Sequence, residues 1–272
     1  MMMEGLRFTA ATHNISHIKL RHLVVHFPNI VLPQLLEMLT DKEAIIRRVA
    51  AETMFEGWQQ FRSYFNYDSV TLLISALKDE DVGVRSAVAP FLANLRDKRA
   101  VLPLIEVLKD ENYEVRLGAA LALGFFDELD AVLPLIDLLN DVHWNVRRTA
   151  AGALGRLRDK ASVPSLLEIL DDENNIVRQE AAFALSLIVD PRAYTPLRER
   201  IILEEDERVK QAIAWSLVQL GDFEHIPLLS SALQGGYWHN SVKEQFADTL
   251  EKRGTPEARE AVRKWRDSSQ NS

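Results

Sequence analysis

Residues 101–124 read VLPLIEVLKDENYEVRLGAALALG, residues 132–155 read VLPLIDLLNDVHWNVRRTAAGALG, and residues 162–185 read SVPSLLEILDDENNIVRQEAAFAL. Each stretch has a proline near its start, an Asp in the middle, an Arg six residues after that Asp, and two alanines just beyond the Arg. Self-similarity at a period of about 31 residues predicts a stacked array of two-helix units rather than a globular fold around one pocket.

The basic residue of each unit sets the register. These residues are Arg47, Arg85, Arg116, Arg147, Arg178 and Lys210, at intervals of 38, 31, 31, 31 and 32 residues. The first five follow an Asp by six residues, namely Asp41, Asp79, Asp110, Asp141 and Asp172, whereas Asp206 lies only four residues before Lys210. A pair that recurs in every unit does the same job in every unit. We therefore interpret it as a ladder of ion pairs between consecutive turns, not as catalytic chemistry.

Each unit contains signals for two helices. A proline suits the first turn of a helix, and the Asp can end that helix and cap the next one. The second helix has apolar residues at helical spacing, which in the third unit are Val115, Ala119, Ala120, Leu123 and Phe126. This spacing predicts one buried face. The small residues, with Gly124 and Gly155, should let helices approach closely.

The stretch VRRTAAGALGRLRDKASVPSLLEILDDENNIVR, from Val146 to Arg178, resembles the HEAT repeat of the short type named for the phycobilisome (phycocyanobilin) lyases. The resemblance covers about residues 30 to 235. It implies an all-α, right-handed solenoid of about seven two-helix repeats. We expect a tail and capping helix over 1–29, the repeat array over 30–235, and a helical cap with a frayed tail over 236–272.

Composition narrows the function. The chain has 272 residues, no cysteine and a net charge of −8. An acidic chain repels phosphate backbones, so we do not expect nucleic acid as a partner. The sequence shows no long apolar run and no signal-peptide core, so we expect a cytoplasmic protein without membrane insertion. We expect no cofactor and no catalytic residue, and cysteine ligands to a metal are excluded.

Histidines cluster near the N-terminus at positions 13, 17, 22 and 26. His22 and His26 are spaced to chelate a metal from one helix, but no carboxylate or thiol completes a site nearby. We therefore predict no metal site and favour a capping helix with its histidines in water.

Function should lie where equivalent repeats differ, because the repeated face forms the core. One row on the second helices points away from the buried face. It carries apolar side chains where polar ones are expected, with two arginines between them: Leu117, Leu121, Phe125, Arg148, Arg156, Phe183, Leu187 and Trp215. If second helices line the inner surface, this row forms a partner-binding groove on the concave face. The alternative is that the face is misassigned by one position, which would return these residues to the core.

The insertion between the first two units is a second candidate. It reads FEGWQQFRSYFNYD over 55–68 and is rich in aromatic residues, among them Phe55, Trp58, Phe61 and Tyr64. Dense aromatic clusters serve as interaction anchors, but they can equally fill the core gap that an irregular unit creates. Both interpretations remain open.

The predicted function is a scaffold or adaptor that binds another protein, such as a second HEAT subunit or a phycobiliprotein. The resemblance also implies an alternative, a bilin lyase-like subunit. In that case the groove would hold an open-chain tetrapyrrole, with Arg148 and Arg156 contacting its propionates.

Overall fold

The computed structural model describes residues 23–222, 224–234, 238, 240–253 and 255–270. Within these ranges the regular structure is entirely helical. The first helices of the repeats are α3 (Pro28–Met38), α6 (Tyr67–Ala76), α8 (Val101–Val107), α10 (Val132–Asp137), α12 (Val163–Glu168), α14 (Tyr194–Leu203) and α16 (Ile226–Gln234). The second helices are α4 (Ala44–Glu56), α7 (Val82–Leu95), α9 (Tyr113–Leu123), α11 (Trp144–Leu157), α13 (Asn175–Ile188), α15 (Glu207–Gln219) and α17 (Asn240–Arg253). Two further helices are α5 (Trp58–Phe61) and α18 (Pro256–Gln270).

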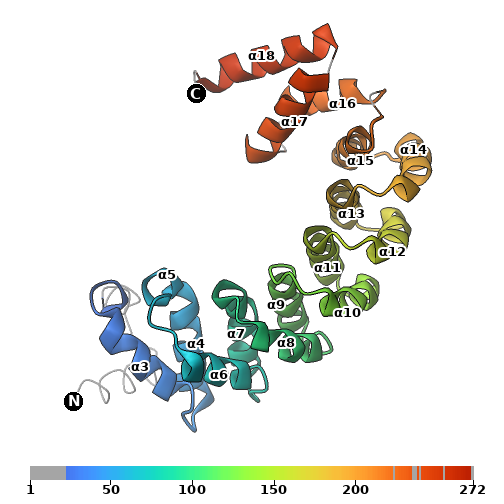
Figure 1. The fold of residues 1–272 in the computed structure, drawn as a ribbon. Helices are drawn as coiled ribbons and strands as arrows, with labels where there is room; N and C mark the ends of the chain where they lie inside the picture. The colour runs from blue at the N-terminus through green and yellow to red at the C-terminus, as the bar shows by residue number, and fades with distance from the viewer. Residues whose placement is uncertain (1–22, 223, 235–237, 239, 254, 271–272) are drawn as a thin grey trace. The chain divides into compact units, whose positions relative to one another are not determined.

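The repeats stack in two layers, as predicted for an all-α solenoid. Second helices pack on one another in succession, α4 on α7 on α9 and α11 on α13 on α15, while first helices form the other layer (Figure 1). The chain divides into two compact units, residues 1–134 and 135–272, with the division inside α10. We call them the N-terminal and C-terminal units. The predicted divisions near residues 30 and 235 stay a prediction, and residues 1–22 of the predicted cap lie outside the described residues.

The predicted core face is confirmed. Val115, Ala119, Ala120 and Leu123 are completely buried, and Phe126 is 4% exposed. The face assignment is therefore correct for these helices and is not shifted by one position. Small residues allow the second helices to approach closely, because a side chain at Gly118 would overlap Pro90 of α7, and one at Gly155 would overlap Ala184 of α13.

The predicted ladder of ion pairs is also confirmed. Arg47 donates to Asp79 through Nε at 2.6 Å and Nη2 at 2.8 Å, and Nη1 donates to the backbone oxygen of Asp41 at 2.9 Å. The same arrangement joins Arg85 to Asp110 and Arg147 to Asp172. Each guanidinium thus binds the turn of its own repeat and the carboxylate of the following one, so the ladder links consecutive turns.

The repeated Asp does not cap the second helix, which corrects the prediction. Its carboxylate instead accepts the backbone N–H two residues ahead, as Asp110 does from Asn112 at 2.9 Å. The residue at that position is the cap: the side chain of Asn112 accepts from the backbone N–H of Glu114 at 2.8 Å. The reason is position: the repeated Asp lies two residues before the N-cap of the second helix, as Asp110 does before Asn112, so its carboxylate bonds to the turn and not to the first turn of the helix.

The sixth repeat keeps the ladder with a longer acid. Glu204, six residues before Lys210, takes the ladder position and accepts from Arg178 Nε and Nη2, both at 2.9 Å. Asp206 is the N-cap of α15. The apparent irregularity in the sequence therefore arises because the acid six residues before Lys210 is Glu rather than Asp.

Candidate functional site

The predicted row of side chains that points away from the buried face of the second helices, here called the outward row, is accessible over part of its length. In the N-terminal unit, Leu117 and Leu121 of α9 are half-buried and Phe125, just after α9, is 41% exposed. In the C-terminal unit, Arg148 and Phe183 are half-buried, Arg156 is exposed and Leu187 is 39% exposed. Each unit therefore presents apolar side chains on the layer of second helices.

Trp215 does not belong to this accessible surface, so the prediction that it contacts a partner is wrong. Its side chain is 7% exposed, and its ring centroid lies 4.8 Å from that of Phe246 in α17. Trp238 packs edge-on against both Phe246 and Phe183, and its indole N–H donates to Gln211 Oε1 at 2.6 Å. The chain's own C-terminal segment thus covers the outward face of α15. The sequence predicted a helical cap over 236–272 but not that this segment would cover Trp215, because Trp238 lies outside the regular repeats.

Arg148 and Arg156 lie one turn before and one turn after Gly152 on α11. The acidic side chain of Glu180, which belongs to α13, lies beside Gly152. A side chain at Gly152 would come within 2.8 Å of Glu180 Oε1. Burial raises the pKa of Glu180, and the charges of Arg148 and Arg156 oppose that rise. The positive charge of the two arginines in the predicted row is therefore partly neutralised. Glu180 lies two residues after the ladder arginine Arg178, so the row read from the sequence did not include it.

The aromatic insertion follows both interpretations left open by the sequence. Phe61 is completely buried, so its predicted partner contact is wrong: α5 packs against α3 and α4, and Phe61 lies so close to Gly57 that any side chain there would overlap its ring. Phe55 and Tyr64 are 43% and 46% exposed, and Trp58 is half-buried. One aromatic residue fills the gap, and the others reach the surface.

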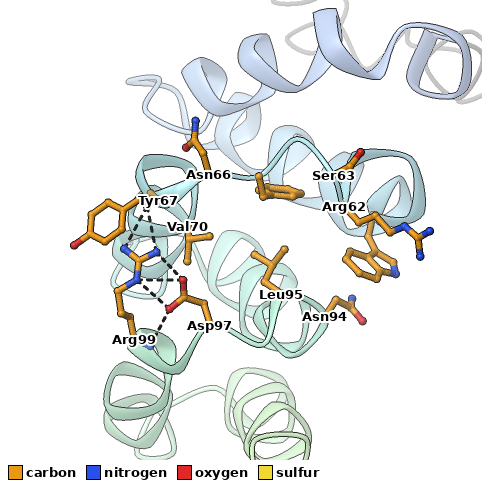
Figure 2. A pocket seen from close by; sticks show the side chains of 11 residues that line it. Arg62, Ser63, Asn66, Tyr67, Val70, Asn94, Leu95, Asp97 and Arg99 are labelled. Carbon is orange, nitrogen blue, oxygen red and sulfur yellow. Dashed lines mark hydrogen bonds and ion pairs between the residues drawn. The ribbon is translucent and has the colours of Figure 1, made fainter.

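The insertion also creates an open pocket of about 720 Å³, which we call the insertion pocket (Figure 2). Its lining comes from the insertion, from the first turn of α6 and from the end of α7 with the turn beyond it: Trp58, Arg62, Ser63, Phe65, Asn66, Tyr67, Val70, Asn94, Leu95, Asp97 and Arg99. The sequence pointed to the aromatic residues. It did not predict Asn94, Leu95 or Asp97 as part of a site, because these residues belong to the end of α7 and the turn after it.

No group of three or more metal-ligating side chains occurs among the described residues, and His13, His17 and His22 lie outside them. No helix in the described part of the chain is long and apolar enough to cross a membrane.

Comparison with known proteins identifies the repeat. The family described as HEAT repeats matches residues 32–124, 70–141, 101–186 and 132–218. No curated protein sequence matches. Similar solved structures include YibA of Escherichia coli (23% identity, 85% of each chain, TM-score 0.58) and the CpcE–CpcF complex of phycocyanin lyase from Nostoc (21% identity, 87% of this chain and 94% of that chain, TM-score 0.57). A designed armadillo repeat protein in complex with the peptide (KR)4 is also similar (20% identity, 70% of this chain and 99% of that chain, TM-score 0.57). At these identities the similarity concerns the fold.

Proposed function

This chain belongs to the HEAT-repeat family, and we propose that it is a non-catalytic scaffold that binds a partner protein on the outward face of its second helices. The observation that carries the proposal is the exposure of Phe125 and Leu187, which occupy the same position in their repeats. Burying the exposed part of such a side chain on association contributes about 1 kcal/mol, because each is only about 40% exposed. Contiguous exposed apolar surface is typical of protein-binding sites.

Site-specific cross-linking tests this proposal. The photoreactive residue p-benzoylphenylalanine replaces Phe125 or Leu187, and matched controls carry it in place of Leu102 or Ile202, which are 66% and 80% exposed on first helices. We expect one partner to be cross-linked at the two test positions and not at the controls, and Phe125→Asp or Leu187→Asp to weaken its capture. Equal cross-linking at all four positions would place binding elsewhere.

An open-chain tetrapyrrole, or a phycobiliprotein that carries one, is the second candidate ligand. The arginines Arg148 and Arg156 match its propionates, and Leu187 offers apolar contact beside them. Mixing the protein with phycocyanobilin should shift the visible absorption of the pigment. We expect the shift to vanish in Arg148→Gln with Arg156→Gln, and to grow in Glu180→Gln because that change removes the carboxylate that opposes an anion. Without any shift, the scaffold role stands alone.

A further inference from the structure

The insertion pocket is the strongest unassigned feature of the N-terminal unit. One of its walls is held rigidly: Arg99 donates to Asp97 through Nε at 3.0 Å and Nη2 at 2.7 Å, and to Thr71 Oγ1 at 2.9 Å. The same guanidinium lies 3.8 Å from the centre of the Tyr67 ring. This wall is preorganised, because the charges of Arg99 and Asp97 satisfy each other. Neither charge is left for a ligand.

The middle of the pocket is apolar. Phe65, Val70 and Leu95 line it, and Phe65 is fixed from behind by an edge-on contact with Phe91 at 5.5 Å between ring centroids. Trp58 also lines the pocket, and Arg62 and Asn94 lie on the side away from Tyr67 (Figure 2). This region suits one apolar side chain.

The side of the pocket away from Tyr67 carries polar groups that remain available for a ligand. Arg62 and Asn94 are both exposed there, and Arg62 forms no ion pair with any described residue. The side-chain amide of Asn94 has one donor group and one acceptor, as a peptide bond does. Counting Arg62, Asp97 and Arg99, the lining has a net charge of +1 (two cations, one anion) on a protein of net charge −8. The local charge therefore favours an acidic ligand.

We propose that the insertion pocket binds an extended acidic peptide segment of a partner protein. An aromatic or aliphatic side chain of the segment enters between Trp58 and Phe65, its backbone pairs with Asn94, and an adjacent carboxylate pairs with Arg62. The open form of the pocket favours a segment of a larger molecule, because small-ligand sites usually bury most of their ligand. This proposal is independent of the binding surface on α9 and α13.

Indole resonances provide a site-specific test with the full chain, ¹⁵N-labelled at tryptophan. The probe is the acetylated peptide Ser-Asp-Phe-Asp-Ser, with Ser-Lys-Phe-Lys-Ser and Ser-Asp-Ser-Asp-Ser as matched controls. We expect the probe to shift the Trp58 indole signal and leave Trp144 and Trp265 unchanged. We also expect each control peptide to bind at least about tenfold more weakly. Equal shifts with all three peptides, or none at Trp58 with the probe, would overturn the proposal.

Two charge-reversal variants sharpen the test. Arg62→Glu should weaken the acidic probe at least about tenfold and favour the lysine peptide, because the exposed charge changes sign. Lys109→Glu makes the same change at an exposed position of the same unit outside the pocket, and should leave both affinities unchanged. Equal effects of the two variants would show that only net charge matters, which would overturn the role of Arg62.

Phenylpropionate tests whether the pocket recognises a peptide or any small aromatic acid, because it has the ring and a carboxylate but no peptide backbone. We expect it to perturb the Trp58 indole at least about tenfold more weakly than the probe peptide. Equal binding would assign the pocket to small aromatic acids and overturn the peptide proposal.

Discussion

At the scale of single residues, the ladder pairs combine charge with burial. The side chains of Arg85 and Asp110 are 11% and 9% exposed. Burial alone would raise the pKa of Asp110, but hydrogen bonds from Arg85 and from the backbone N–H of Asn112 outweigh it and lower the pKa. The ionised form is therefore the one that the fold stabilises.

Asp110→Asn should lower the free energy of unfolding by about 3 kcal/mol at pH 7, because the change leaves a buried guanidinium without its counter-ion. The folded pKa of Asp110 lies below the unfolded value of about 3.9, so its contribution is complete above pH ~4 and is lost as the pH falls below that. Urea unfolding at pH 7 and pH 3 should therefore show a difference between parent and variant that shrinks in acid.

The control for this variant is Glu106→Gln, which breaks the exposed pair with Lys78 at 2.8 Å. Exposed pairs contribute at most about 1 kcal/mol. A difference for Asp110→Asn that is as small as the control, or independent of pH, would contradict the ladder's stabilising role.

Left-handed residues end three of the second helices, and none of them is glycine. Arg96, Arg158 and Val189 have φ values of 49°, 54° and 54°. Val189 is the least favourable of the three, because a β-branched side chain is strained in this region. Its N–H still donates to Leu185 at 3.1 Å, which closes the last turn of α13.

Val189→Gly should therefore stabilise the protein by about 1 kcal/mol, since Val189 is already 42% exposed and loses little packing. The matched control is Ile176→Gly, a similarly exposed position within α13, which should cost about 1 kcal/mol in helix propensity. Thermal unfolding measures both variants. A loss of stability in Val189→Gly comparable to that of the control would show that the backbone strain is not relieved.

At the scale of elements, the close contact between α11 and α13 depends more on Gly155 than on Gly152. A methyl group at Gly155 would lie 2.8 Å from Ala184 Cα and 3.0 Å from its Cβ, whereas one at Gly152 would meet only the end of the Glu180 side chain. A backbone atom cannot move without moving its helix, but a carboxylate can rotate away.

Gly155→Ala should consequently destabilise the C-terminal unit by about 1–3 kcal/mol, because it separates the two helices. Gly152→Ala should change the free energy of unfolding by no more than about 1 kcal/mol, with the helix propensity of alanine in its favour. Denaturant unfolding of the two variants gives the comparison. Equal costs would mean that the helix spacing does not rest on Gly155.

At the scale of the whole molecule, the C-terminal segment packs back on the second helices α13 and α15. Trp215, Trp238 and Phe246 come from α15, the segment before α17 and α17 itself, and their rings form one cluster with Phe183 of α13. The cluster therefore buries apolar side chains of α13 and α15 under residues that lie beyond the most regular repeats.

Trp238→Ala should lower the stability of the C-terminal unit by about 3–5 kcal/mol, as expected for removal of a buried indole. Hydrogen exchange should show lost protection in α13, α15 and α17. The control Trp144→Ala removes a half-buried indole that stacks on His143, and should cost about 1 kcal/mol or less. Similar losses for both variants would contradict the role of Trp238 in this cluster.

We could predict the repeat, the two-layer architecture, the buried face and the ladder from the sequence alone, because these contacts recur with every unit. Even Glu204 obeys that spacing once an acid of either length is allowed. Phe61 and Trp215 were different. Tertiary packing buries them, because in each case one packing partner stands outside the regular period: α5, which carries Phe61 and packs against α3 and α4, and the C-terminal segment that covers Trp215. The insertion pocket has the same origin, because its walls come from separate helices and only folding brings Trp58 and Asn94 to one opening.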